Sequence, residues 1–136
     1  MLQAVNAFGA IWMTDLDKAQ AKAKEEHKLV LLDFTGSDWC PPCMALHKNV
    51  LTSAEFDKFA KENLVLVVVD FPREKVLTKD EKAVNAFLAK RFGVTGYPTV
   101  VVLDSEGKEL QKKVGYGGTS AKDFVADIAK LKKKAS

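Results

Sequence analysis

The amino-acid sequence predicts an α/β domain in which helices cover both faces of a mixed sheet. Three observations support this prediction. Three short apolar runs, at residues 29–34, 64–69 and 99–103, have the length of strands. Segments rich in helix formers or helix-start signals lie between them. The elements follow the order α, β, α, β, α, β, β, α, which indicates parallel strands first and an antiparallel hairpin at the end.

The first part of the chain predicts a helix, a strand and a turn. Thr14 followed by Asp17 is a plausible helix start, and residues 19–26 are rich in helix formers. The apolar run at 29–34 has the length of a strand, and residues 36–38 have the composition of a turn. A covering helix is therefore expected to lead into a buried strand.

Two prolines and a capping box predict the helices that follow. Pro41 and Pro42 open a helix, because proline is tolerated in the first helical turn but not later. Thr52 with Glu55 has the spacing of a capping box, which predicts a second helical piece through about Asn63.

The next strand and helix have equally clear signals. Residues 64–69 read LVLVVV, the pattern of a central parallel strand that is covered on both faces. Thr78 with Glu81 forms another capping box, and Gly93 ends the helix that it starts. The apolar residues at helical spacing on this helix are Val84, Phe87, Leu88 and Phe92.

The C-terminal part predicts a hairpin and a last helix. The strand at 99–103 is entered through Pro98, a strand position that proline can occupy. Residues 104–107 predict a hairpin turn into an alternating strand at 108–115, and Ser120 begins the last helix. The residues that share one face of this helix are Phe124, Ile128 and Leu131.

Composition and charge exclude several classes of protein. The 136 residues, 47% hydrophobic and 29% charged, suit one globular domain and not a disordered chain. No apolar run approaches the roughly 18 residues of a membrane-spanning helix. Two cysteines are too few for a disulfide-rich scaffold or a four-thiolate zinc site. The net charge of +3 comes from a lysine-rich tail at 130–134. We therefore expect a monomer with no nucleic-acid partner and no membrane span.

The N-terminal segment has two interpretations. Residues 1–13 are mildly apolar but contain no Lys or Arg, so they lack the basic start of a secretory leader. They are either an N-terminal extension left from a leader, with a cleavage-like site at 5–7, or a first strand or loose arm. We place the domain at 14–136.

The residues that carry chemistry are Cys40 and Cys43, at the start of the helix that the two prolines open. Their spacing allows a small disulfide ring. Amide groups at a helix N-terminus stabilise a thiolate on the first cysteine, and the thiolate is the attacking species in disulfide exchange. The second cysteine lies one turn further and can attack the first to release a bound substrate. The spacing alone also fits a zinc site or an idle pair.

Several segments together resemble a known family, the thioredoxin-fold thiol–disulfide oxidoreductases. The matching segments, in the family's order, are 31–34 (LLDF), 39–43 (WCPPC), 92–99 (FGVTGYPT) and 114–115 (VG). The resemblance covers roughly residues 14–133 and implies a thioredoxin-like three-layer α/β/α sandwich with a C-terminal antiparallel hairpin. The segments GSDWC and DFPR look more like a bacterial branch, often exported, of thioredoxin-like or disulfide-isomerase-like proteins.

The resemblance also implies roles for individual residues. Cys40 would be the nucleophile and Cys43 the resolving thiol of a redox-active disulfide. Pro98 matches the family's cis-proline. Trp39, Tyr97 and Pro98 would line a groove in which the Tyr97 backbone pairs with an extended substrate. No organic cofactor or metal is implied.

Asp33 matches the family's buried aspartate, which accepts a proton from the resolving cysteine. Burial should raise the pKa of this carboxyl group. Two departures weaken the match: the loop from Asp33 to Cys40 is one residue longer than the thioredoxin pattern, and the apolar run at 64–69 lacks the lysine that often partners the aspartate. The alternative is a turn acid at the strand end.

Two further features have competing interpretations. The segment 70–90 exceeds the usual thioredoxin connection by roughly a dozen residues, so it either shapes partner choice or forms a longer covering helix. His47, four residues after Cys43, suggests a metal ligand beside the cysteine pair. A closed set of four ligands is missing, so we expect a solvated histidine and no metal.

We therefore expect a thiol–disulfide oxidoreductase that acts on protein or small-thiol substrates. Its electrons would come from a separate thiol reductase or go to a separate oxidant, and the direction stays open. The alternative function is a redox-inactive thioredoxin-fold binding or chaperone-like module. The resemblance favours a periplasmic or otherwise exported bacterial protein, with the cytoplasm as the alternative.

Overall fold

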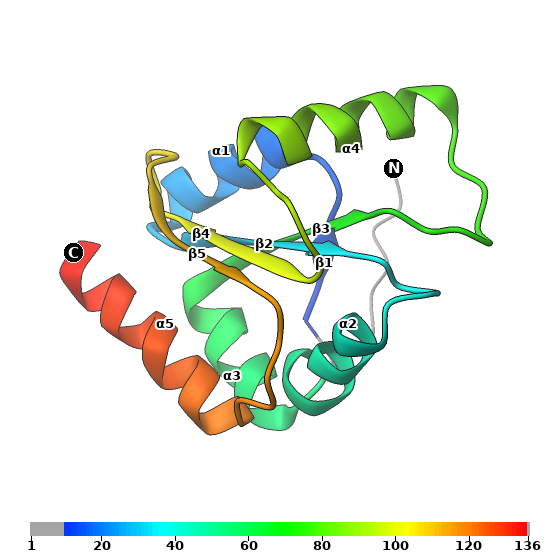
Figure 1. Cartoon of the computed structure of the whole chain (residues 1–136). Coiled ribbons are helices and arrows are strands. Elements are labelled where there is room, and N and C mark those ends of the chain that lie inside the picture. Colours follow the sequence, from blue (N-terminus) through cyan, green and yellow to red (C-terminus); the bar gives the residue numbers. More distant parts are fainter. Residues whose placement is uncertain (1–9, 136) are drawn as a thin grey trace.

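The computed structural model describes residues 10–135 and contains a five-stranded sheet with helices on both faces (Figure 1). In chain order the elements are β1 (Trp12–Met13), α1 (Leu16–Glu26), β2 (Leu29–Thr35), α2 (Pro41–Leu46), the π-helical turn η1 (His47–Leu51), α3 (Ala54–Asn63), β3 (Leu64–Asp70), α4 (Lys79–Arg91), β4 (Thr99–Leu103), β5 (Glu109–Val114) and α5 (Ala121–Ala135). This arrangement confirms the predicted three-layer α/β/α sandwich.

The sheet is mixed, and its strand order is β1-β3-β2-β4-β5. β3 runs parallel to both of its neighbours, whereas β4 runs antiparallel to both β2 and β5. The predicted C-terminal antiparallel hairpin is thus confirmed. Since β2 lies in the middle, its residues are buried on both faces, and this explains the continuous apolar sequence before Asp33.

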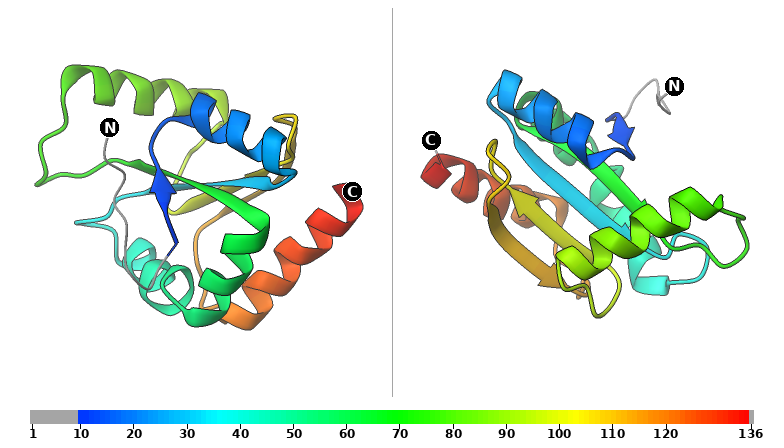
Figure 2. Two further views of the ribbon diagram at one scale, coloured as in Figure 1. Left: turned by 180° about the vertical axis from the view of Figure 1, so that it is seen from behind. Right: turned by 90° about the horizontal axis from the view of Figure 1, so that it is seen from above.

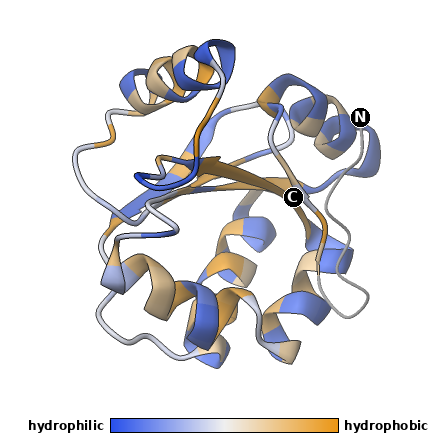
Figure 3. Ribbon diagram, turned by 90° about the vertical axis from the view of Figure 1, so that its right-hand side faces the viewer, coloured by the Kyte–Doolittle hydropathy of each residue, from blue (hydrophilic) through white to orange (hydrophobic). Residues whose placement is uncertain are grey.

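Alternating residues of the central strands fill two separate cores, one on each face of the sheet. The left view of Figure 2 shows the helices that cover these two faces. One core lies under α1 and α4 and includes Val30, Leu32 and Phe34. The other lies under α2, η1, α3 and α5 and includes Leu29 and Leu31. Figure 3 shows hydrophobic strands between helices in which hydrophilic and hydrophobic segments alternate. By this alternation Asp33 faces the layer that carries α2.

The N-terminal segment contributes a short strand to the sheet. Trp12 pairs with Leu66 and Met13 with Val67, so the sheet begins two residues before residue 14. The first-strand interpretation therefore describes Trp12 and Met13. Residues 1–9 of the proposed leader remnant, including the cleavage-like site at 5–7, lie outside the described residues.

The helix starts follow the predicted sites to within one residue. The carboxylate of Asp15, not Thr14, accepts from the backbone amide of Lys18 and caps α1. Ser53 caps α3 in place of the predicted Thr52–Glu55 box, because the Thr52 hydroxyl donates back to the carbonyls of His47 and Lys48 at the start of η1. The Thr78–Glu81 capping box of α4 and the proline start of α2 are confirmed.

The apolar stripe predicted on α4 is only half correct. Leu88 and Phe92 are buried in the sheet-facing core, but Val84 and Phe87 are 50% and 65% exposed. No helix within residues 10–135 is long and apolar enough to cross a membrane.

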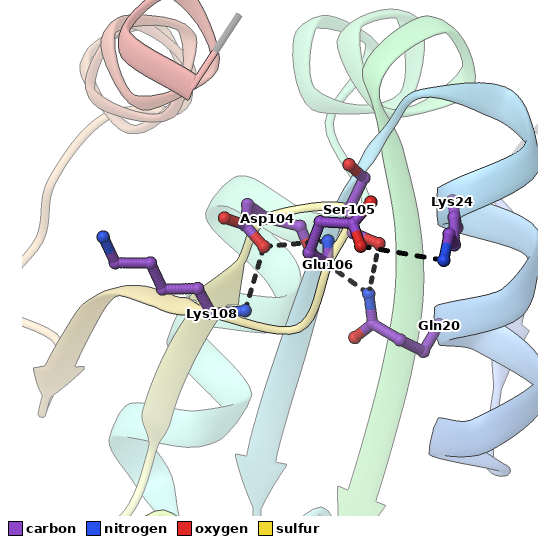
Figure 4. A network of polar contacts seen from close by, with 6 residues as sticks. All are labelled: Gln20, Lys24, Asp104, Ser105, Glu106 and Lys108. Carbon is purple, nitrogen blue, oxygen red and sulfur yellow. Dashed lines mark hydrogen bonds and ion pairs between the residues drawn. The ribbon is translucent and has the colours of Figure 1, made fainter.

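The β4–β5 turn is fixed to α1 by a polar network (Figure 4). The Asp104 carboxylate accepts from the amides of Glu106 and Lys108, and Gly107 adopts a φ of +91°. The Gln20 side-chain amide donates to the carbonyls of Asp104 and Ser105. The predicted turn at 104–107 is therefore confirmed, and its contacts hold the tip of the hairpin against α1.

Candidate active site

Cys40 and Cys43 lie where the loop after β2 enters α2. The two sulfurs form a disulfide, with the Cα atoms 5.2 Å apart, and each residue is only 3% exposed. Cys40 is the N-cap of α2, and its Sγ accepts a hydrogen bond from the backbone amide of Cys43 at 3.3 Å. The amide of Gly36 donates to the Cys43 Sγ at 3.5 Å. Both sulfurs thus receive donors that would stabilise a thiolate.

Aromatic side chains form a wall next to this loop. The Trp39 and Tyr97 rings meet edge-on with centroids 5.8 Å apart, and the centroids of the Phe71 and Tyr97 rings are 5.3 Å apart. The Tyr97–Pro98 peptide bond is cis, as the resemblance implies, and Pro98 is buried at the entry to β4. The structure therefore brings Trp39 and Tyr97 together from segments far apart in the sequence.

The segment after β3 holds Trp39 in place. The Trp39 indole N–H donates to the carbonyl of Phe71 at 2.7 Å, and the Arg73 guanidinium lies 3.9 Å from the centre of the indole ring. The Asp38 carboxylate accepts from three successive backbone amides, those of Arg73, Glu74 and Lys75. These hydrogen bonds lower the pKa of Asp38.

The extra segment at 70–90 thus does two things. Its helix α4 covers the sheet, as one interpretation expected, while the turn at 71–75 binds the loop that carries Trp39. The roles of Asp38 and Arg73 were not predicted, because no local pattern links residues more than 30 positions apart. The DFPR sequence was the only available signal.

Gly36→Ala should displace Trp39, because a Cβ at this position would overlap the Cε2 of the indole ring. We expect a loss of about 1–3 kcal/mol in the free energy of unfolding, the usual cost of overpacking. The Trp39 fluorescence should change as well. Gly117→Ala is the control, because nothing lies within 4 Å of a Cβ there and its φ is not positive. Equal behaviour of the two variants would contradict the prediction.

Asp33 lies inside β2, not in the turn after it, so the turn-acid alternative is wrong. Its side chain is buried, and Oδ1 has no hydrogen-bond partner in the described part of the chain. Burial raises the pKa of Asp33 from its ordinary value of 3.8 to about 7, and the charge of Asp70 adds to this increase. The carboxyl group is therefore partly ionised near neutral pH.

Asp33 and Cys43 line the same pocket, which has a volume of about 350 Å³. The other lining residues are Trp12, Thr35, Ser37, Met44, His47 and Val68. Val68 is the register partner of Asp33 on β3, so an apolar side chain stands where a lysine often does in the family. Within residues 10–135 no group of three or more His, Cys, Asp or Glu side chains is arranged to hold a metal ion.

Comparison with known proteins decides the family. A thioredoxin-like domain family matches residues 16–132. This chain belongs to the thioredoxin-like family. Over 118 residues the chain is 36% identical to the disulfide bond reductase DsbH of Chlamydia pneumoniae, covering 85% of this chain and 70% of that protein.

Solved structures extend the likeness to the whole thioredoxin-like fold. A structure titled DsbH oxidoreductase superimposes with a TM-score of 0.81 at 31% identity, covering 98% of this chain and 93% of that one. The chain is also 27% identical to the thiol:disulfide interchange protein DsbD of Colwellia psychrerythraea, but spans only 18% of that protein. Together with the Cys40–Cys43 disulfide, these relations identify this thioredoxin-like protein as a thiol–disulfide oxidoreductase.

Proposed function

We propose that the chain works as a disulfide reductase, with Cys40 as the nucleophile and Cys43 as the resolving thiol. The place of Asp33 carries this proposal: a buried carboxyl group with a pKa of about 7 shares a pocket with Cys43. Such a group can remove the proton of the resolving thiol at neutral pH. Rapid resolution favours complete transfer of electrons to the substrate over the long-lived mixed disulfide that isomerisation needs.

The reaction transfers two electrons in two exchange steps. The Cys40 thiolate attacks one sulfur of a substrate disulfide, and the other substrate sulfur leaves as a thiolate that takes a proton from water. Asp33 then accepts the proton of the Cys43 thiol. The Cys43 thiolate attacks the Cys40 Sγ, closes the disulfide and releases the second substrate sulfur. An upstream thiol donor restores the dithiol form and so supplies the two electrons.

We also propose a binding role for the aromatic wall. Trp39, Tyr97 and Pro98 form one side of the approach to the cysteines, and an extended substrate segment would pair with the Tyr97 backbone. The partners would then be disulfide-containing proteins and a thiol reductase, in keeping with the names of DsbH and DsbD. An exported bacterial location fits these partners, and cell fractionation of the native source would distinguish it from a cytoplasmic one.

The reduction potential of the Cys40–Cys43 pair tests the direction. We would equilibrate the protein in thiol–disulfide buffers and follow Trp39 fluorescence in a Trp12→Phe background, with thiol trapping as a second readout. If the protein is a reductase, we expect a reduction potential of about −270 mV. A reduction potential of about −120 mV would make the protein an oxidant instead, and an intermediate potential would favour isomerisation. Either result would overturn the reductase proposal.

A further inference from the structure

Asp70, the last residue of β3, lies on the same face of the sheet as Asp33. In the register of the two parallel strands, Val68 pairs with Asp33 and Asp70 pairs with Thr35. Residues two apart on a strand share a face, so all four side chains point to the layer that carries α2. Asp33, Thr35 and Val68 line the pocket. Asp70 is therefore the next residue of β3 on that face, beyond Val68.

Ser37, which also lines the pocket, holds the carboxylate of Asp70 in place. Its backbone amide donates to Oδ1 at 3.0 Å, and its hydroxyl donates to Oδ2 at 2.5 Å. The backbone around Asp70 is fixed as well. The side-chain amide of Asn85 on α4 donates to the Asp70 carbonyl at 2.8 Å, and the amide of Phe71 donates to the carbonyl of Thr35 at 2.8 Å. The half-buried carboxylate therefore has a defined position at the rim of the pocket.

A charge at this position acts on a buried carboxyl group. Asp33 is 6% exposed, and its Oδ1 has no hydrogen-bond partner among residues 10–135. Its neighbours on the adjacent strands are Val68 of β3 and Val100 of β4. Burial is the first cause that raises the pKa of Asp33, and the charge of Asp70 is the second. Asp33 therefore binds a proton more firmly than burial alone would make it.

No cation among the described residues offsets this charge. None of the ion pairs within residues 10–135 includes Asp70, and no lysine or arginine of this part of the chain lines the pocket. The other titratable side chains that line the pocket are Cys43, once it is reduced, and His47, which is exposed. The fixed negative charge that acts on Asp33 is thus that of Asp70.

We propose that Asp70, held by Ser37, is a positioning residue for the resolving step. Its charge repels negative charge from Asp33, which therefore takes the proton of the Cys43 thiol more readily. This inference rests on the proposed function. When the proton moves, the negative charge leaves Asp33 for the Cys43 sulfur, to which the amide of Gly36 donates. The Cys43 thiolate then attacks as described above. Asp70 itself gains no proton and no electrons.

Asp70→Asn tests the inference in the full-length protein. Asparagine can still accept from the amide of Ser37, but it carries no charge. Asp33 then becomes a weaker base, which ionises at lower pH and accepts the proton more slowly. The pH profile of the resolving step should therefore shift to lower pH, and its plateau at high pH should fall about threefold. The measurement is the release of the second thiolate from one molecule of a chromogenic aryl disulfide by the reduced protein, followed by stopped flow.

Two further variants complete this test. Glu74→Gln removes an exposed charge from the 71–75 turn and should leave the pH profile unchanged. Ser37→Ala removes one of the two donors to the Asp70 carboxylate and should shift the profile in the same direction, but less. A lower plateau without a shift would show that Asp70 only supports the loop, and would overturn the inference. Circular dichroism checks the fold, and Ser37→Ala decides if Asp70→Asn does not fold.

A second measurement separates this inference from the proposed function. The titration of the Asp33 carboxyl group in the oxidised protein, followed by carbon NMR, needs no turnover. We expect its midpoint to fall in Asp70→Asn and to stay unchanged in Glu74→Gln. An unchanged midpoint in Asp70→Asn would overturn the role of Asp70. If the wild type reduces no disulfide while the midpoint still moves, the reductase proposal fails and the action of Asp70 on Asp33 stands.

Discussion

Cys43→Ser should turn the protein into a trap for its substrates. Cys40 keeps the amide donor at its Sγ and still attacks a disulfide, but no thiol remains within the chain to resolve the product. We therefore expect a mixed disulfide that accumulates stoichiometrically and is visible on non-reducing gels. Dithiothreitol should release it. The measurement is the mass of the adduct formed with a small disulfide or with insulin.

Cys40→Ser is the matched control for this trap. It removes the proposed nucleophile and leaves Cys43 buried at the base of the pocket, where it is 3% exposed. We expect no adduct, and a rate of insulin reduction equal to that of the reaction without protein. An adduct on Cys43 in this variant, with none on Cys40 in Cys43→Ser, would reverse the two proposed roles.

The strands could be predicted from the sequence because central strands are buried on both faces. The runs at 29–34 and 64–69 contain hardly any polar residue, and each became a strand to within one residue. The helix starts could be predicted only to within one residue. Thr52 and Ser53 are neighbours with similar capping ability, and the backbone conformation, not residue type, selects Ser53.

The parts of the candidate site that depend on local sequence could be predicted, and the parts that depend on contacts between distant segments could not. The cysteine pair is local and could be recognised directly, since both residues lie at one helix start. The contacts of Asp38 with the 71–75 turn, and the pocket that joins Asp33 to His47, bring together distant segments. Nothing in a single sequence reports such a juxtaposition. The exposure of Phe87 shows the converse limit, because helical spacing alone does not say whether a residue faces a core.

Asp33→Asn should remove a pH dependence of stability that the wild type carries. Asp33 has a pKa of about 7 in the folded protein and an ordinary value of 3.8, which we take for the unfolded chain. Between these values the folded state binds more protons, so the free energy of unfolding is greatest at low pH. This contribution is lost as the pH rises towards 7 and stays lost above it. The difference of about three units between the two pKa values corresponds to about 4 kcal/mol in the free energy of unfolding. Asparagine cannot ionise, so the variant should be a few kcal/mol more stable than the wild type at pH 8.

Urea unfolding of the oxidised proteins between pH 4.5 and pH 8.5 measures this difference. The two proteins should have similar stability at the acidic end, where Asp33 is neutral, and diverge as the pH rises. Asp70→Asn is an informative control, because the charge of Asp70 is the second cause of the raised pKa. That variant should keep a smaller slope, since burial still opposes ionisation of Asp33. Parallel curves for wild type and Asp33→Asn would mean that the carboxyl group ionises as easily in the fold as in water, and its use as a base at neutral pH would then lose its physical support.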